Sequence, residues 1–524
     1  MSRQLMLGNE ALARGAYEAC VRFASSYPGT PSTEITEYLS RYEPVKTEWA
    51  PNEKTAVESA IGASIAGARA LSAMKHVGLN VAADPLFTAS YTGVNGGLVI
   101  CVADDPGMHS SQNEQDSRHY ARASKTLMLE PSDSEECRLF VKKAFELSEI
   151  YDTPVLLRLT TRVAHSRSLA QTRPREELPL KLYKKDPGKY IMMPAMARVR
   201  HGIVEERITK LISLANDCDL NLIENNNRSV GIMASGICYQ YAKEALGDSV
   251  SYLKLGMVYP LPDGLIKEFC SLVDVCYVLE ELDPYIEEHC KNLGINNIIG
   301  KEKFSLLGEY NSKIVRTVVL GKESEETDDN SSLNDLPGRP PMLCPGCPHR
   351  NIFESIKVAI PDIIVTGDIG CYTLAALPPI GMLDTCVCMG ASVGMAHGIL
   401  KVDPGRAGKV VAVLGDSTFI HSGITGLINA VYNDSPITVV ILDNSTTGMT
   451  GHQDNPATGR NLKGDPAVKL DLKKLCRSVG VRRVVIADPY DKSFGEIVKS
   501  ELEALEPSVV IAQRPCVLLK SKNR

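Results

Sequence analysis

Two polar segments near the C-terminus place a glycine, a carboxylate and an amide where they could do chemistry. Gly415, Asp416 and Ser417 directly follow the apolar run 410–414, and Asn444 lies just after the apolar run 437–442. Both runs are typical of buried parallel strands, with room for one helix between them. A carboxylate and an amide at such strand ends can bind one Mg²⁺, while the glycine lets the backbone approach phosphate oxygens. Doubly wound domains without this chemistry also contain a strand, a polar turn and a helix, so the pattern alone leaves both interpretations open.

Four cysteines in the same part of the chain could bind a metal ion or an iron–sulfur cluster. Cys344 and Cys347 are separated by a proline and a glycine, a spacing at which two thiolates can bind one metal or one edge of a cluster. Cys371 follows the expected strand 363–366, and Cys516 lies near the C-terminus. The Cys344/Cys347 pair alone is equally compatible with half of a zinc site. Together with a diphosphate site in the same domain, the four thiols form a stronger signal for redox chemistry.

Composition and charge exclude several classes of protein. The 524 residues are enough for about two to four domains. The net charge is −6, with Lys and Arg spread along the chain, so we expect no nucleic-acid partner. Residues 1–14 lack a signal-peptide core, and no apolar run approaches the roughly 18 residues of a membrane span. We therefore expect a cytoplasmic protein that binds no membrane, in which the 15 cysteines are buried thiols and metal ligands rather than disulfides.

The sequence divides into three blocks. Helical and strand-like patterns alternate over residues 1–175, which end in a polar stretch. A smaller α/β block spans 200–320, and no chemistry is evident in it. Residues 321–341 are acidic and then rich in proline, which predicts a linker. The block 342–524 contains the polar segments and the four cysteines.

Thiamine diphosphate enzymes carry a Gly-Asp-x…Asn segment like that at 415–444, and this sequence resembles them. A more specific resemblance, to the large subunits of indolepyruvate:ferredoxin oxidoreductases, runs through all three blocks. It rests on residues 27–33 (Tyr-Pro-Gly-Thr-Pro-Ser-Thr), 52–54 (Asn-Glu-Lys), 74–80 (Met-Lys-His-Val-Gly-Leu-Asn), 110–118 (Ser-Ser-Gln-Asn-Glu-Gln-Asp-Ser-Arg), 344–350 (Cys-Pro-Gly-Cys-Pro-His-Arg) and 367–371 (Gly-Asp-Ile-Gly-Cys). The resemblance implies conversion of an aryl pyruvate and coenzyme A to aryl acetyl-CoA and CO₂, with two electrons passed singly to ferredoxin.

The resemblance also implies a fold and a set of cofactors. The expected fold is α/β, with two doubly wound thiamine-diphosphate-binding domains flanking a smaller domain like the C-terminal domain of transketolase. Residues 1–175 would hold the aminopyrimidine, 200–320 would form the smaller domain, and 342–524 would hold the diphosphate and Mg²⁺ beside an iron–sulfur cluster. The implied cofactors are thiamine diphosphate, Mg²⁺ and one [4Fe–4S] cluster.

Two residues of the first block match functional positions of the family. Glu53 matches the activating glutamate, which exchanges a proton with the aminopyrimidine. An acid in the first turn of a helix is also favoured by the helix dipole, so Glu53 could have that role alone. Thr30 matches a threonine near the substrate in related pyruvate enzymes, although an ordinary N-cap residue would look the same.

The remaining matched residues lie in the third block. The resemblance implies that Gly415, Asp416, Ser417, Asn444 and Thr446 bind the cofactor. Asp416, the Asn444 side chain and the Thr446 carbonyl would be the Mg²⁺ ligands. The ligands of the cluster would be Cys344, Cys347, Cys371 and Cys516.

Other conspicuous side chains carry no assigned role. A lone histidine is more often packed or solvated than catalytic, so none is assigned a role. Cys386 and Cys388 are expected to be buried free thiols rather than ligands. Arg118, in a stretch expected to be a solvated helix, is a weak candidate for binding a substrate carboxylate. The unassigned histidines in matching segments are His76, His109, His349 and His452.

The sequence departs from many large subunits of the family in one respect. It contains no Cys-x-x-Cys-x-x-Cys run of the kind found in their C-terminal ferredoxin-like module. We therefore expect a single cluster beside the thiamine, with electrons passing directly to ferredoxin or to an iron–sulfur acceptor protein.

The resemblance implies a smaller partner subunit, like the gamma domain of pyruvate enzymes, and a dimer of heterodimers. Coenzyme A and an aryl pyruvate would be the small-molecule partners. The preferred oxoacid, and whether a site forms within or between chains, are left open. Two rival functions remain: a non-redox thiamine decarboxylase or ligase, whose thiols bind zinc or nothing, and an inactive scaffold subunit.

Overall fold

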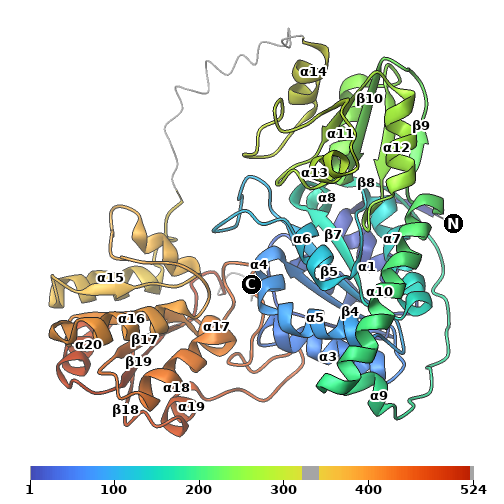
Figure 1. Cartoon of the computed structure of the whole chain (residues 1–524). Helices are drawn as coiled ribbons and strands as arrows, with labels where there is room; N and C mark the ends of the chain where they lie inside the picture. The colour runs from blue at the N-terminus through green and yellow to red at the C-terminus, as the bar shows by residue number, and fades with distance from the viewer. Residues whose placement is uncertain (1, 322–340, 520–524) are drawn as a thin grey trace. The chain divides into compact units, whose positions relative to one another are not determined.

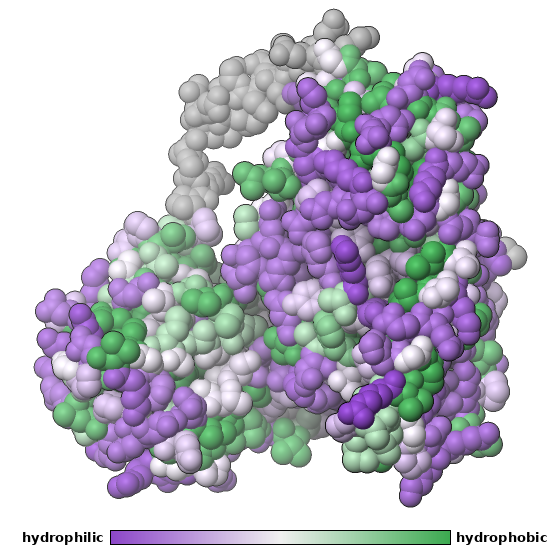
Figure 2. Space-filling model, in the orientation of Figure 1, coloured by the Kyte–Doolittle hydropathy of each residue, from purple (hydrophilic) through white to green (hydrophobic). Residues whose placement is uncertain are grey.

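The computed structural model describes residues 2–321 and 341–519 in two compact units, Met1–Ser332 and Leu333–Arg524 (Figure 1). The predicted linker, 321–341, lies outside the described residues except for its two end residues. No helix of the described ranges is long and apolar enough to cross a membrane. On the face shown in Figure 2, hydrophilic side chains predominate and hydrophobic ones occur in small groups.

The first unit is built around a seven-stranded sheet. Its neighbouring strands are parallel except for the antiparallel pair β12–β6 at one edge. In sheet order the strands are β12 (Met257–Tyr259), β6 (Leu127–Leu129), β7 (Val155–Thr160), β5 (Leu98–Asp104), β4 (Ala70–Lys75), β2 (Phe23–Ser26) and β3 (Lys46–Trp49).

Both faces of this sheet are buried. Along β5, Val99 and Cys101 point into one core, whereas Ile100 and Val102 point into another. The first core is closed by α1 (Gly8–Glu18), α7 (Ser134–Tyr151) and α10 (Pro194–Asp217). The second is closed by α3 (Glu53–Ile65), α4 (His76–Val81), α5 (Ala83–Thr92) and α6 (Arg118–Ser124). Helices on both faces of a mainly parallel sheet define a doubly wound domain.

Residues 222–320 form a smaller five-stranded α/β part (Figure 1). Its strands in sheet order are β14 (Ile298–Ile299), β13 (Val275–Leu279), β10 (Val230–Ser235), β11 (Ser251–Leu255) and β9 (Leu222–Glu224), of which only β9 is antiparallel to its neighbour. Its helices are α11 (Gly236–Leu246), α12 (Asp263–Leu272), α13 (Tyr285–Asn292) and α14 (Ser312–Leu320).

The predicted blocks 1–175 and 200–320 share a hydrophobic core. Met233 of β10 and Ile286 of α13 pack in the same cluster as Val102 of the large sheet. β12 also lies in the sequence of the smaller block but completes the large sheet. The two blocks therefore form one compact unit, and their division into separate domains stays a prediction.

Five short elements complete the part of the first unit that the structure describes. β1 (Ser2–Leu7) and β8 (Arg167–Thr172) form a separate antiparallel pair. The remaining short helices are α2 (Thr33–Leu39), α8 (Thr161–His165) and α9 (Pro187–Tyr190).

The second unit contains a fully parallel five-stranded sheet. In sheet order its strands are β15 (Ile364–Thr366), β16 (Val410–Gly415), β17 (Thr438–Asp443), β19 (Ser508–Gln513) and β18 (Arg483–Ala487). Its helices are α15 (Pro348–Ala359), α16 (Ala391–Val402), the short α17 (Asp416–Thr418), α18 (Ile424–Tyr432), α19 (Leu472–Ser478) and α20 (Phe494–Glu503).

This sheet is also buried on both faces. Val411 and Val413 of β16 pack against α15 and α20, whereas Val410 and Leu414 pack in a second core with residues of α16, α18 and α19. The predicted α/β fold, with two doubly wound sheets and a smaller α/β part, is confirmed.

Candidate active site

The ends of β16 and β17 bring the predicted diphosphate residues together. The two strands pair in parallel, with Gly415 opposite Leu442, so that Asp416 and Asn444 lie at the same edge of the sheet. Gly415 lies against an aromatic ring, because a Cβ there would be 3.1 Å from Cε1 of Tyr372. The backbone N–H of Thr446 donates to Oδ1 of Asn444 at 3.2 Å.

Asp416 is 2% exposed, and no ion pair joins it to any described residue. Burial and the negative charge of nearby Asp443 raise the pKa of Asp416 to about 7. A divalent cation coordinated by this carboxylate would offset both effects, because it supplies the opposite charge that the buried site lacks. The side-chain chemistry at this edge therefore fits Mg²⁺, which prefers oxygen ligands.

The loop after β17 adds a residue that the sequence analysis did not identify. Nδ2 of Asn455 donates to Oδ2 of Asp416 at 3.3 Å and lies 3.4 Å from Oγ1 of Thr447. The Thr447 hydroxyl donates in turn to Oγ of Ser417 at 3.2 Å. Asn455 therefore orients the predicted metal ligand and connects it to the hydroxyls of Thr447 and Ser417. The loop is irregular, so no helical or strand periodicity predicts the position of Asn455. Its only signal in the sequence is a polar side chain shortly after Asn444.

The four predicted cluster cysteines lie in one neighbourhood. The pKa of Cys371 is raised to about 11 by burial and by the charges of Cys347, Cys516 and Cys344. Cys347 is the N-cap residue of α15, and its backbone N–H donates to the Cys344 carbonyl at 3.0 Å. Burial raises the pKa of Cys347, while hydrogen bonds from the backbone of His349 and Arg350 oppose that rise. Such N–H groups would stabilise a ligating thiolate.

The cysteines are adjacent to the predicted diphosphate site. Sγ of Cys371 lies 3.3 Å, and Nδ2 of Asn444 lies 3.7 Å, from the position that a Cβ would take at Gly448. The two atoms are therefore separated by no more than the sum of these distances. The backbone N–H of Cys516 also donates to the Asn444 carbonyl at 2.9 Å. A metal centre on these thiols would lie beside a cofactor bound at Asp416 and Asn444.

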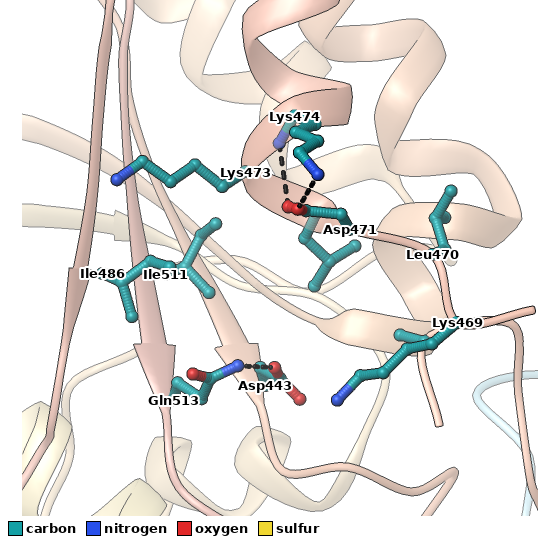
Figure 3. Close-up of a pocket in the computed structure, with 11 residues that line it drawn as sticks. Asp443, Lys469, Leu470, Asp471, Lys473, Lys474, Ile486, Ile511 and Gln513 are labelled. Atoms are coloured by element: carbon teal, nitrogen blue, oxygen red, sulfur yellow. Dashed lines mark hydrogen bonds and ion pairs between the residues drawn. The ribbon is translucent and has the colours of Figure 1, made fainter. Parts of the chain in front are cut away.

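A cavity of about 420 Å³ borders the loop between β17 and α19 (Figure 3). Ile486 and Ile511 line it, and Nε2 of Gln513 donates to Asp443 at 2.8 Å at the strand ends. Lys469 points toward Asp443 in Figure 3 but forms no hydrogen bond or ion pair with the residues that the structure describes. None of Asp416, Asn444 and Thr446 lines this cavity, so it is a neighbour of the predicted diphosphate site and not part of it.

In the first unit, Glu53 is the first residue of α3 and is 4% exposed. The neighbouring Asn52, not Glu53, caps the helix by accepting from the Thr55 N–H at 2.9 Å. A Cβ at Gly78 would lie 2.5 Å from Oε1 of Glu53, so the glycine leaves room for this carboxylate. An acid that only stabilises the helix dipole can stay on the helix surface. Because Glu53 is buried against α4, its position is not explained by the helix dipole alone.

Thr30 lies in the loop between β2 and α2, and the peptide bond that joins it to Pro31 is cis. The N-cap of α2 is Ser32, so the alternative role of Thr30 as the helix cap is wrong. Because β2 and β3 are neighbouring parallel strands, Thr30 and Glu53 follow strands that end at the same edge of the sheet.

The expectation that Arg118 is solvated is wrong. Its guanidinium donates to Asp116, to Glu280 at 2.6 Å and to the carbonyls of Glu281 and Asp283 at 3.1 Å, and the residue is fully buried. These partners use its donors, so Arg118 joins the smaller sheet to the larger one and is not available for a substrate carboxylate.

The structure also corrects the expectation for Cys386 and Cys388, because both are exposed rather than buried. Of the unassigned histidines, His349 is buried, and desolvation lowers its pKa to about 4. His76 lies 3.2 Å from the Asn113 carbonyl, and His109 pairs with Glu309 at 2.9 Å. These contacts are consistent with packed or paired histidines.

Both units match family models of thiamine-diphosphate-binding domains. Residues 14–213 match the family model described as pyruvate flavodoxin/ferredoxin oxidoreductase, thiamine diP-bdg, and 368–512 match thiamine pyrophosphate enzyme, C-terminal TPP binding domain. The fold is similar to that of a 2-oxoglutarate:ferredoxin oxidoreductase from Magnetococcus marinus, with a TM-score of 0.52 and 17% identity. That similarity covers 61% of this chain and 65% of the Magnetococcus chain, which is less than two thirds of its length.

Several curated relatives match over nearly the whole sequence. The indolepyruvate oxidoreductase subunit IorA of Archaeoglobus fulgidus is 41% identical over 99% of this chain and 87% of its own length. The subunits of the same name from Pyrococcus horikoshii and Methanothermobacter thermautotrophicus are 42% and 40% identical, each over 98% of this chain, and over 86% and 87% of their own lengths. With thiamine-binding family models matching both units, this similarity shows that the chain belongs to the IorA family of indolepyruvate oxidoreductase subunits.

Proposed function

We propose that this chain, with a partner subunit, oxidatively decarboxylates aryl pyruvates of the indolepyruvate type to aryl acetyl-CoA and CO₂. Electrons would leave singly through an iron–sulfur cluster to ferredoxin or a similar carrier. The observation that carries the proposal is that the Cys371 thiol and the Asn444 side-chain amide both pack against the same glycine, Gly448. An electron acceptor beside the diphosphate site favours oxidation over simple decarboxylation. The names of the relatives support the choice of substrate.

Each part of the chain has a proposed role. Residues 342–524 hold the diphosphate and Mg²⁺, with Asp416, the Asn444 side chain and the Thr446 carbonyl as ligands. Residues 1–175 hold the aminopyrimidine, and 200–320 form the smaller transketolase-like domain. When bound, thiamine diphosphate supplies a carbon nucleophile and an electron sink. The Glu53 carboxyl exchanges a proton with a ring nitrogen of the aminopyrimidine.

The neighbourhood of the four thiols supports a cluster. The charges of Cys347, Cys516 and Cys344 all act on the Cys371 thiol, so the four side chains lie near one another. A [4Fe–4S] cluster is held by four cysteine thiolates, each on a separate iron atom. We therefore propose Cys344, Cys347, Cys371 and Cys516 as ligands of one such cluster.

The two rival functions are tested with protein purified anaerobically together with its partner subunit. Indolepyruvate and coenzyme A are added with a one-electron dye, and reduced dye, CO₂ and acyl-CoA are measured. The proposal requires all three products in matching amounts. A non-redox decarboxylase would release CO₂ and an aldehyde without reducing the dye, and an inactive scaffold subunit would release nothing.

We expect the isolated chain to show no dye reduction with indolepyruvate and coenzyme A, and activity to return when the partner subunit is added. The relatives are named as subunits, and the resemblance implies a smaller partner, with a dimer of heterodimers as the proposed assembly. The measurement is dye reduction by the chain alone, by the partner alone and by the mixture, with the mass of each species determined. Full activity of the isolated chain would contradict this expectation.

Replacing Asn455 by alanine should weaken Mg²⁺ binding in the presence of thiamine diphosphate by roughly 10- to 100-fold, because Asn455 orients a metal ligand from outside the coordination shell. Titration of the metal-free protein with Mg²⁺, followed by calorimetry, measures the change. Asn433→Ala, an exposed asparagine of the same unit, is the matched control. Equal affinities in both variants would show that the Asn455–Asp416 hydrogen bond does not orient the metal site.

A further inference from the structure

Lys75 is a half-buried cation at the same sheet edge as Glu53. It is the last residue of β4, which lies between β5 and β2 in the sheet. The neighbouring strands are parallel, so the loop residues Gly29 after β2 and Asp105 after β5 flank Lys75 at their carboxyl ends. Ligands of open α/β sheets bind outside the carboxyl ends of the strands.

The side chain of Lys75 is held along its length. A Cβ at Gly29 would lie 3.2 Å from Cγ of Lys75, so the aliphatic stem packs against the backbone of the Gly29–Thr30 turn. The ammonium donates to the Ser110 carbonyl at 2.8 Å. An ammonium has three donors, and within the described ranges Lys75 has this one hydrogen bond and no ion pair. Donors therefore remain for a ligand.

The loop that provides the Ser110 carbonyl is fixed by Asp105. Oδ2 of Asp105 accepts from the Ser110 N–H at 2.8 Å and from the Ser111 hydroxyl at 2.7 Å, and Oδ1 accepts from the Thr161 hydroxyl at 2.7 Å. The carboxylate is engaged by these three donors and forms no ion pair with Lys75. Asp105 thus stabilises the loop around the ammonium without neutralising it directly.

The arginines near this edge already have carboxylate partners. Arg158 donates to Asp104 at 2.7 Å and to Glu130 at 2.6 Å. Arg162 pairs with Glu309 at 2.6 Å, and Arg118 is enclosed by the acids described above. Lys75 differs from these arginines because its ammonium contacts a carbonyl and no carboxylate.

We propose that Lys75 binds the carboxylate of the 2-oxoacid substrate, an assignment that rests on the proposed function. Every 2-oxoacid carries this group, and a charge-assisted hydrogen bond to an ammonium in a partly desolvated site is the strongest contact that the edge can offer it. Burial lowers the pKa of Lys75, although the charges of Asp105 and Glu53 partly offset the effect. A bound carboxylate supplies the negative partner that this cation lacks.

The test separates the carboxylate from the rest of the substrate. Two unreactive probes, indolelactate and tryptophol, share the indole ring, but only indolelactate has a carboxylate. Their affinities are measured by calorimetry on the complex with the partner subunit. In Lys75→Met we expect indolelactate to bind roughly 10- to 100-fold more weakly and tryptophol to bind as in the wild type. Lys75→Arg should recover part of the loss, because it restores the charge.

Controls identify what a negative result means. Lys125→Met removes a half-buried lysine paired with Glu205 and should change neither affinity. The thermal midpoint of Lys75→Met, compared with the wild type, establishes that the variant is folded. Equal weakening of both probes, or no weakening of either, would overturn the assignment of Lys75. Wild-type enzyme that binds indolelactate through Lys75 but does not oxidise indolepyruvate would instead refute the proposed function.

Discussion

Replacing Glu53 by glutamine should leave thiamine diphosphate bound and lower kcat by roughly 10²- to 10⁴-fold, the usual contribution of a positioned proton-transfer group. Glutamine keeps the size of the side chain and its place against Gly78, but it cannot exchange a proton with the aminopyrimidine. The loss should therefore appear in kcat and not in cofactor affinity. Steady-state dye reduction and calorimetric titration with thiamine diphosphate measure the two quantities.

The matched control is Glu58→Gln on the same helix. Glu58 is exposed and pairs with Lys54, so its replacement should leave kcat unchanged. A second variant, Gly78→Ala, places a methyl group 2.5 Å from the native position of Oε1 of Glu53 and should lower kcat by moving that carboxylate. Near-normal turnover in Glu53→Gln would show that Glu53 only supports the start of the helix.

Serine in place of Cys371 should remove the bound iron and sulfide and abolish dye reduction. Cys371 lies beside Asn444, so it would hold the cluster at its contact with the diphosphate site. Serine is a poor ligand for iron–sulfur clusters, which are held by thiolates. Iron and acid-labile sulfide analysis of anaerobically purified protein, together with its visible absorption, measures the loss. Thiamine diphosphate binding should persist, because Asp416 and Asn444 are unchanged.

Two cysteines of the same unit serve as controls. Cys388 is exposed, and Cys476 is buried in a core away from the four thiols, so Cys388→Ser and Cys476→Ser should retain wild-type iron. The variants of Cys344, Cys347 and Cys516 should behave like Cys371→Ser. If all four variants kept their iron, these thiols would not be the ligands. If zinc replaced iron in the wild-type protein, the redox function itself would fail.

The strands of the second unit could be predicted because their signal is local. The runs 410–414 and 437–442 are apolar, and polar residues follow them. The observed β16 ends one residue later than predicted, and β17 begins and ends one residue later. Asp416 and Asn444 follow at once from those strand ends. Their adjacency needs only the rule that neighbouring parallel strands end at the same edge.

Arg118 and Lys75 show where sequence patterns fail. Arg118 lies in a polar stretch, but one of its partners, Glu280, is 162 residues away, and no local pattern records that pairing. The contacts of Lys75 are also distant in the sequence, because Gly29 and Ser110, which contact its side chain, lie in two other loops. In both cases the environment of the charge is set by distant segments that meet only after the sheet has formed. The sequence does not predict the role of Asn455, because its loop lacks the periodicity of a helix or a strand.

The pairing of β12 with β6 has a consequence for the synthesis of the protein. β6 is made early, whereas its edge partner, residues 257–259, leaves the ribosome only after most of the smaller sheet has been translated. Until then the nascent chain carries an open strand edge, together with apolar side chains of the shared core that have no cover. Domains usually fold one after another from the N-terminus during translation. Here the large sheet cannot be completed before three of the five strands of the smaller sheet, β9, β10 and β11, have been made, so its open edge stays available to chaperones during that part of translation.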